Sequence, residues 1–196
     1  YIYSCTNIAI DGIGLKLALQ LRGLSVERFH GPNLCEKLIA SKLHYGNTIL
    51  VVGGNEKNRK LVEYGEIEGY FPLPKMSDEG DFSSCLDELL YFLKSFKGRK
   101  VIFISLGLPK QELFSKWLHN SILTDPSITD KEIVLIPVGA AVDFISGHKT
   151  RSGKIWQNLG LEWLPRLVRE PRMLVRILRS MVAMIAVILG FKVFKK

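Results

Sequence analysis

The chain has 196 residues, 47% of them hydrophobic, and its 27 lysines and arginines against 19 acidic residues give a formal net charge of +8. This length and apolar content suffice for one sizeable core, so no second globular domain is required. The cysteines, Cys5, Cys35 and Cys85, form no Cys-x-x-Cys pair, which argues against a disulfide framework or a zinc site and favours a reducing, cytoplasmic compartment.

In chain order, the first feature is the opening on Tyr1 rather than Met, with no basic segment before an apolar run, which indicates a missing natural start and no signal peptide. Apolar runs then alternate with helical patterns, as strand-helix units require. We expect strands at residues 8–10, 48–52, 100–105 and 132–138, and helices at 14–22, 33–45, 55–64, 82–96 and 109–120. Near-continuous apolar strands suit a sheet that is covered on both faces. The pattern predicts a Rossmann-like α/β fold with a mostly parallel sheet flanked by helices.

Polar residues and glycines follow the predicted strands. Lys110, Gln111 and Glu112 come just after the strand expected at 100–105. Gly53 and Gly54 follow the strand expected at 48–52. Loops that leave the carboxyl ends of parallel strands form the binding crevice of an open sheet, so these residues are candidates for binding a substrate. The alternative is a solvated helix start, in which Glu112 only favours the positive end of the helix dipole.

Asp11 and Asp143 are candidate functional carboxylates. Asp11 is flanked by glycine, which lets a substrate hydroxyl approach, so it suits a general base; an ordinary Asp-Gly turn is the alternative. Asp143 lies among apolar residues and suits a contact to uracil or ribose; a charge at a helix N-terminus is the alternative. Arg28 and Arg151 suit the neutralisation of phosphates, although lone surface arginines are common.

No cofactor or metal motif is found in the sequence. Leu17 stands where a dinucleotide fingerprint needs its third glycine, and Ile155 stands where a P-loop needs Ser or Thr. The four histidines are scattered, and no Asp-x-Asp motif occurs. We therefore expect no cofactor and no metal ligands.

The C-terminal part is basic and apolar, which predicts a membrane-associating helical appendage at residues 164–196 after a core at residues 1–163. The apolar segment 180–191 is shorter than the ~20 residues that span a bilayer, so the expected helix at 171–190 lies in the membrane interface. A core-packing helix is the alternative. Nucleic acid is not expected, because no helix-turn-helix, zinc or RNP signal is found. The predicted membrane-binding residues are Arg166, Arg169, Arg172, Arg176 and Arg179.

Several motifs occur in a fixed order along the chain. They are Asp11-Gly12-x-Gly14, Glu27-Arg28 with Gly31, Val52-Gly53-Gly54, Gly107-x-Pro109-Lys110-Gln111-Glu112, Gly139-Ala140-x-x-Asp143-Phe144-x-x-Gly147, Arg151 with Lys154, and the stretch from Leu159 to Arg172 around Glu162-Trp163-Leu164. In order and spacing this set resembles the WecG/TagA/CpsF glycosyltransferases (glycosyltransferase family 26) from about Asp11 through Arg172.

The resemblance implies an inverting, metal-independent transfer of an N-acetylmannosamine-type or related hexose from a UDP-sugar to a polyprenyl-diphosphate-linked acceptor. It places the enzyme in bacterial synthesis of cell-surface polysaccharide or teichoic acid, on the cytoplasmic face of the cell membrane. A non-catalytic module that binds nucleotide sugars or anionic lipid is the alternative. Homo-oligomerisation stays open.

The resemblance also implies residue roles. Asp11 corresponds to the catalytic base, Arg28 to a diphosphate contact, Gln111 and Glu112 to a crevice pair, and Asp143 to a uridine contact. The chain departs from the family at three places. Ile10 stands where the family has Pro before the Asp-Gly, and Arg151-Ser152-Gly153 stands where it has Arg-Ala-Pro. Pro165 replaces an aromatic residue. The family's opening strand with its Thr-x-Asn motif has no counterpart before Tyr1, which predicts that the chain is catalytically incomplete.

Overall fold

The computed structural model describes residues 9–73, 83–95, 98–128, 133–158, 161, 163–169 and 173–189. By its internal contacts the chain divides into two compact units. Residues 31–150 form one, named here the sheet unit, and residues 9–30 with 151–189 form the other, named the helical unit. The boundary after residue 163 stays a prediction.

The sheet unit contains, among the described residues, a sheet of four parallel strands in the order β2-β1-β3-β4. The fold class is therefore α/β with a parallel sheet, as the alternation of strands and helices predicted. The strands expected at 48–52, 100–105 and 132–138 are confirmed to within one or two residues, whereas β2 was not expected. The bounds are β1 (Thr48–Gly53), β2 (Gly69–Phe71), β3 (Lys100–Ser105) and β4 (Ile133–Pro137).

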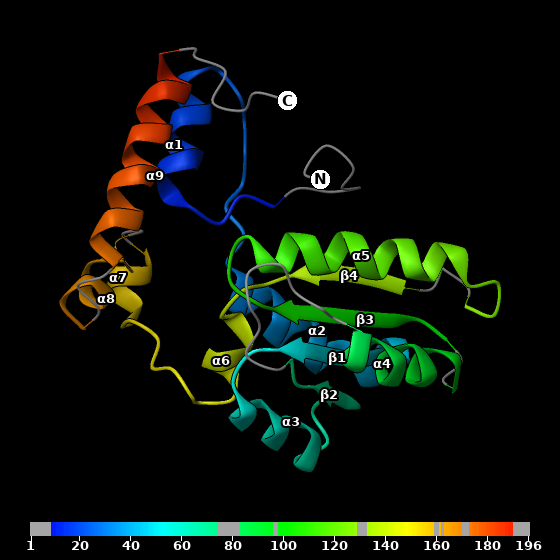
Figure 1. The fold of residues 1–196 in the computed structure, drawn as a ribbon. Coiled ribbons are helices and arrows are strands. Elements are labelled where there is room, and N and C mark those ends of the chain that lie inside the picture. The colour runs from blue at the N-terminus through cyan, green and yellow to red at the C-terminus, as the bar shows by residue number, and fades with distance from the viewer. Residues whose placement is uncertain are drawn as a thin grey trace. The chain divides into compact units, whose positions relative to one another are not determined.

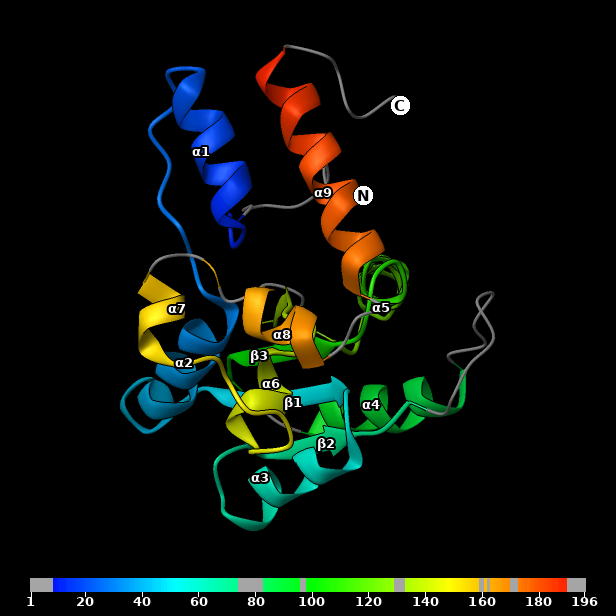
Figure 2. The same cartoon turned by 90° about the vertical axis from the view of Figure 1, so that its left-hand side faces the viewer.

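Helices cover both faces of this sheet, and Figure 2 shows α4 and α5 on the side opposite to α2. Pro32 suits the first turn of α2, which begins two residues before the expected 33. The helix expected at 55–64 is a 3-10 turn, η2, followed by the short helix α3, and the Asn55 side chain caps η2 by accepting from the Lys57 N–H. The bounds are α2 (Gly31–Tyr45), η2 (Glu56–Arg59), α3 (Lys60–Glu63), α4 (Ser83–Ser95), α5 (Lys110–Thr124) and α6 (Ala141–Ile145).

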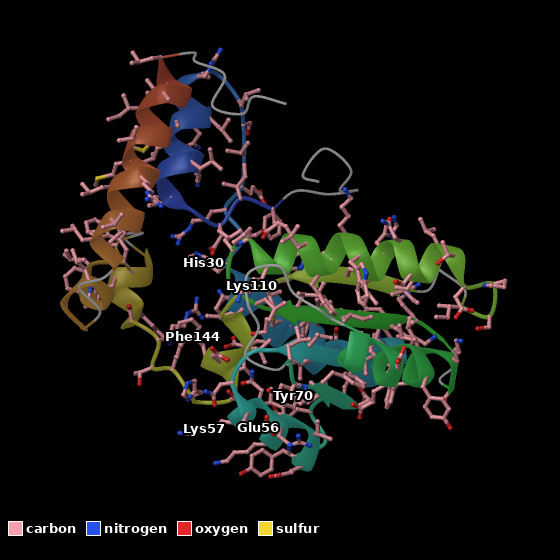
Figure 3. All side chains as sticks on the ribbon, in the orientation of Figure 1. His30, Glu56, Lys57, Tyr70, Lys110 and Phe144 are labelled. Atoms are coloured by element: carbon pink, nitrogen blue, oxygen red, sulfur yellow. The ribbon has the colours of Figure 1, made fainter. Side chains whose placement is uncertain are left out.

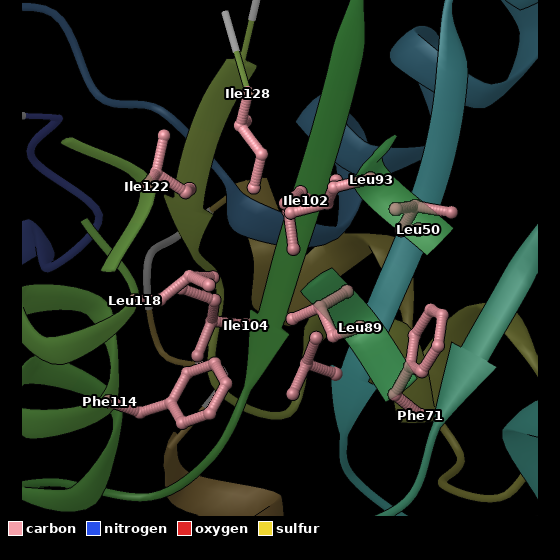
Figure 4. Close-up of a cluster of buried hydrophobic side chains, with 11 residues drawn as sticks. Leu50, Phe71, Leu89, Leu93, Ile102, Ile104, Phe114, Leu118, Ile122 and Ile128 are labelled. Carbon is pink, nitrogen blue, oxygen red and sulfur yellow. The ribbon is translucent and has the colours of Figure 1, made fainter. Parts of the chain in front are cut away.

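One core lies between the sheet and helices α4 and α5. Successive strand residues point to opposite faces, so alternate residues of β1 and β3 face these helices. On α4, the apolar residues Leu89 and Leu93 lie in this core and are 0% and 2% exposed. Figure 4 shows the side chains of this cluster, which are Leu50, Val52, Phe71, Leu89, Leu93, Ile102, Ile104, Phe114, Leu118, Ile122 and Ile128.

A second core lies on the other face, under α2, α3 and α6. It contains Ile49 and Val51 of β1, Phe103 of β3, Val142 of α6 and Cys35 of α2. Burial raises the pKa of the Cys35 thiol to about 12, with a further contribution from the charge of Glu36. Cys35 is a free cysteine and belongs to the packing of α2 on the sheet.

The helical unit contains α1 (Ile13–Leu21), α7 (Lys154–Asn158), α8 (Trp163–Arg169) and α9 (Met173–Ile188). Helix α1 lies beside α9 in Figures 1 and 2. A Cβ at Gly14 would lie 3.0 Å from Met184 Sδ, so the missing side chain permits this close approach. Before α1, Ile10 forms an isolated parallel bridge with Arg28. Ile8, in the strand expected at 8–10, and both ends of the helix expected at 171–190 lie outside the described residues.

None of the helices in the described part of the chain has the length and apolar character needed to cross a bilayer.

The packing of α5 gives a stability prediction. Phe114 is 0% exposed in the core, whereas its neighbour Leu113 is 50% exposed on the same helix. Truncation of a buried Phe removes apolar contacts and leaves a cavity, so Phe114→Ala should lower the free energy of unfolding by about 3–5 kcal/mol. Leu113→Ala is the matched control and should change it by no more than about 0.5 kcal/mol. Urea unfolding followed by circular dichroism measures both, and equal losses would show that α5 is not packed in this register.

Candidate functional site

The carboxyl ends of the parallel strands meet at one edge of the sheet unit. The register places Gly53 beside Ser105, and Ile104 beside Pro137. Figure 3 shows Lys110, at the start of α5, and Phe144, on α6, at the edge toward which the arrows of β1 and β3 point. Open parallel sheets bind their ligands at this edge. Of the residues predicted to bind substrate, Gly53, Gly54, Lys110, Gln111, Glu112 and Asp143 lie on its loops and helix starts.

A tight turn leaves β1 at Gly53 and Gly54. Their φ angles are +74° and +83°, in the left-handed region where glycine is favoured. Space is also restricted, because a Cβ at Gly54 would lie 2.4 Å from Asn58 Nδ2 and 2.8 Å from Ser105 Oγ. The backbone of this turn therefore lies directly against the polar side chains behind it.

The Asp143 carboxylate lies behind the turn and accepts hydrogen bonds from the chain itself. Oδ1 accepts from the Asn55 backbone N–H at 3.2 Å and from Asn58 Nδ2 at 3.1 Å. Oδ2 forms an ion pair with Lys149 Nζ at 3.1 Å. The Asp143 side chain is only 9% exposed. The carboxylate thus links the end of β1 to α6, which follows β4.

Asn58, Ser105 and Ser146 belong to this site although the sequence did not suggest them. Ser146 Oγ donates to Asn58 Oδ1 at 2.6 Å, so both ends of the fully buried Asn58 amide are bonded. Ser105 Oγ donates to the Gly139 carbonyl at 2.7 Å and ties the end of β3 to the loop after β4. The available signals were weak: a polar residue three positions after Asn55 and a serine at a strand end.

The start of α5 provides acceptors that receive no hydrogen bond from the described part of the chain. Gln111 Nε2 donates to Glu112 Oε1 at 2.7 Å, which aligns the two side chains. Gln111 Oε1 and Glu112 Oε2 are buried and receive no hydrogen bond in the described structure. An unsatisfied buried acceptor costs about 1–3 kcal/mol, so ligand hydroxyl or N–H groups would stabilise this arrangement. The crevice pair predicted at these positions therefore has the chemistry of a hydroxyl-binding site.

Asp11 and Arg28, the predicted base and phosphate contact, come together in the helical unit. The bridge between Ile10 and Arg28 aligns the two segments, and the Phe29 N–H donates to the Ile10 carbonyl at 2.9 Å. Arg28 Nε donates to the main-chain carbonyl of Asp11. Asp11 is exposed just before α1, with Gly12 as its N-cap. Arg151, also in the helical unit, is half-buried.

The predicted membrane-binding arginines belong to the end of the helical unit. Arg166 and Arg169 lie on α8, whereas Arg176 and Arg179 lie on α9. The Arg179 side chain is exposed, and Arg172 lies outside the described residues.

Among the residues with described structure, no group of three or more His, Cys, Asp or Glu side chains is arranged to hold a metal ion.

Two glycines with similar backbone angles allow a controlled test of the turn. Gly54 and Gly65 have φ angles of +83° and +68°, but a Cβ at Gly65 would meet nothing within 4 Å. Both substitutions to alanine add backbone strain of about 1 kcal/mol, and Gly54→Ala adds a clash that should cost about 1–3 kcal/mol more. Urea unfolding should therefore show a larger loss for Gly54→Ala than for Gly65→Ala. Indistinguishable losses would contradict the close packing of Asn58 and Ser105 against the turn.

The chain was also compared with known proteins. No solved structure matches it significantly. The sequence profile described as the "Glycosyl transferase WecG/TagA/CpsF family" matches residues 2–196, which is nearly the whole chain. The chain therefore belongs to the WecG/TagA/CpsF family of glycosyltransferases.

Proposed function

We propose that the chain is an inverting, metal-independent glycosyltransferase that moves an N-acetylmannosamine-type or related hexose from a UDP-sugar to a polyprenyl-diphosphate-linked acceptor. Membership of the family supports a transferase that uses a nucleotide-sugar donor and an acceptor, and cell-surface polysaccharide synthesis in general. The UDP group, the hexose, the polyprenyl acceptor and a teichoic acid or polysaccharide product are the finer parts of the proposal.

The observation that carries the proposal is that Asp11 and Arg28 lie on backbone segments held side by side. Glycosyl transfer needs a base for the acceptor hydroxyl and positive charge for the departing diphosphate. The bridge at Ile10 and the bond from Arg28 Nε to the Asp11 carbonyl hold a carboxylate and a guanidinium on neighbouring backbone segments. These residues lie 17 positions apart in the sequence, and this arrangement provides both groups.

In the proposed reaction, Asp11 removes the proton of the acceptor hydroxyl as its oxygen attacks the anomeric carbon. The bond from that carbon to the diphosphate breaks, the configuration inverts, and UDP leaves with the electron pair. Arg28 and Arg151 are proposed to stabilise the charge on the leaving diphosphate. In the sheet unit, Gly53, Gly54, Lys110, Gln111 and Glu112 are proposed to bind the donor, with the buried acceptors of Gln111 and Glu112 receiving hydrogen bonds from sugar hydroxyls.

Asp11→Asn, made in a full-length protein that carries the family's opening strand, tests the chemical step. The substitution removes the proton-accepting carboxylate at nearly constant size, so turnover should fall by a factor on the order of 10²–10⁴ while the Kd for UDP stays within about twofold. Release of UDP from a UDP-sugar in the presence of a lipid-diphosphate-sugar acceptor measures turnover. The control is Asp87→Asn, at an exposed carboxylate on α4, which should leave turnover unchanged.

Turnover that persists in Asp11→Asn would remove Asp11 as the base. Binding of UDP-sugar without turnover in the full-length protein would instead favour a non-catalytic nucleotide-sugar module. Binding to anionic lipid without binding of UDP-sugar would favour a lipid-binding module.

The acceptor proposal implies contact with the membrane, and we assign this to the helical unit. Helix α9 exposes large apolar side chains along its length, including Leu178 at 52% and Ile185 at 52%, and its neighbour α1 exposes Leu21 at 72%. An amphipathic surface of this kind with basic residues nearby is typical of helices in a membrane interface. Arg166, Arg169, Arg172, Arg176 and Arg179 are proposed to bind anionic headgroups on the inner face of the cell membrane, each contributing roughly 1 kcal/mol.

Charge reversal on α9 tests membrane binding. Arg179→Glu replaces an exposed basic residue, so it should weaken co-sedimentation with phosphatidylglycerol vesicles at least fivefold, which corresponds to roughly 1 kcal/mol. Lys57→Glu makes the same change of net charge in the sheet unit and should have a much smaller effect. Deletion of residues 171–196 should abolish vesicle binding, and high salt should weaken binding of the intact chain. Equal binding with and without residues 171–196 would refute the assignment.

A further inference from the structure

We infer that Asp143 is a positioning residue for the nucleotide-sugar donor and acts through the turn at Gly53, Gly54 and Asn55 without touching the ligand. The inference rests on the proposed function, because it concerns binding of the donor at the carboxyl edge of the sheet. It assigns Asp143 a different role from the uridine contact that its sequence motif suggested.

The surroundings of Asp143 disfavour a direct ligand contact by its carboxylate. Its side chain is 9% exposed, and its two carboxylate oxygens already interact with three donors, the Asn55 N–H, Asn58 Nδ2 and Lys149 Nζ. The Lys149 N–H also donates to the Asp143 carbonyl at 2.8 Å, which holds the segment after α6 in place. Oδ1 thus already accepts the two hydrogen bonds that one oxygen ordinarily takes, so a ligand N–H at Oδ1 would have to displace one of its donors.

The bonds of Asp143 instead reach the backbone of the turn. Oδ1 accepts a hydrogen bond from the backbone N–H of Asn55, the residue directly after Gly54. Asn58, the second donor to Oδ1, lies where a Cβ of Gly54 would be, with its Nδ2 at 2.4 Å. The carboxylate thus determines where the turn lies, both by a direct bond and by holding Asn58 against it.

Substitution of Asn58 distinguishes positioning of the turn from direct contact between Asp143 and the ligand. It is 0% exposed, so it cannot touch a donor, and it is bonded to Asp143 on one side and to Ser146 on the other. If Asp143 acts through the turn, loss of Asn58 must weaken donor binding as loss of Asp143 does. Because both act through one network, their effects must also be non-additive.

The experiment measures the Kd of UDP by calorimetry for the intact chain and for Asp143→Ala, Asn58→Ala, the double variant and Asp143→Asn. Each single alanine variant should weaken UDP binding roughly tenfold, and the double variant should be no weaker than the worse single. Asp143→Asn should stay within about threefold of the unsubstituted chain, because a carboxamide oxygen can accept both bonds that Oδ1 accepts. Asp87→Asn is the control for loss of a carboxylate elsewhere in the sheet unit.

Three further measurements extend the test, and the first two keep it independent of folding and of the donor assignment. If the alanine variants unfold, Ser146→Ala removes the bond to Asn58 Oδ1 and a longer one, of 3.4 Å, to the Asp143 carbonyl, and it should raise the Kd about threefold. Amide exchange in the ligand-free chain should show that the Asn55 N–H loses protection in Asp143→Ala and keeps it in Asp143→Asn. Where turnover is measurable, KM for the donor should rise in Asp143→Ala with little change in kcat.

The outcomes separate the two proposals. A normal Kd in Asn58→Ala together with a Kd in Asp143→Asn as weak as in Asp143→Ala would show direct contact by the charge and overturn the inference. Absence of UDP binding to the unsubstituted chain would overturn the donor proposal and the donor role of Asp143 with it. Unchanged protection of the Asn55 N–H in Asp143→Ala would overturn the positioning itself, whatever the ligand.

Discussion

Parallel pairing of β1 with β3, and of β3 with β4, is the constraint on which the rest of the sheet unit depends. Because every strand runs in the same direction, Gly53, Ser105 and Pro137 end at one edge, and the loops that follow must share that edge. Such pairing requires a crossover between consecutive strands, and the crossovers supply helices for both faces. The same geometry therefore produces two apolar cores and gathers the polar loops of the candidate site.

At the carboxyl edge of the sheet, a cluster of buried polar side chains takes the place of apolar packing. Asn58 and Asp143 are nearly inaccessible, yet both ends of the Asn58 amide and Oδ1 of Asp143 have partners that connect the loop after β1 with α6. In a low-dielectric interior such a network is stable only when it is complete, so the loops after β1, β3 and β4 depend on one another. At the start of α5, by contrast, Gln111 and Glu112 each keep one buried acceptor that no donor among the described residues reaches. The edge thus combines a satisfied part, which is rigid, with an unsatisfied part, which has the chemistry to bind a ligand.

The sequence predicted the strands and helices that have a long apolar run or a clear apolar period, and it missed short elements that have neither. Runs such as Ile133–Pro137 are apolar over their whole length, and the leucines of α4 recur at helical spacing. β2 is only three residues long and α6 only five, so neither offers enough residues for a period to be detected. Asp143 was found because it stands in a motif. Asn58 was missed because its role depends on a residue 85 positions away, and such a contact exists only after folding.

The Cys35 thiol of the sheet unit has low chemical reactivity in the folded protein. Because burial raises the pKa of this thiol to about 12, very little thiolate is present at neutral pH, and the thiolate is the form that reacts with oxidants and alkylating agents. Even that fraction lies at 0% exposure between α2 and the sheet. Reaction at this sulfur therefore requires α2 to separate from the sheet, so its rate reports how often that face opens. Oxidative damage at Cys35 would follow unfolding and would not cause it.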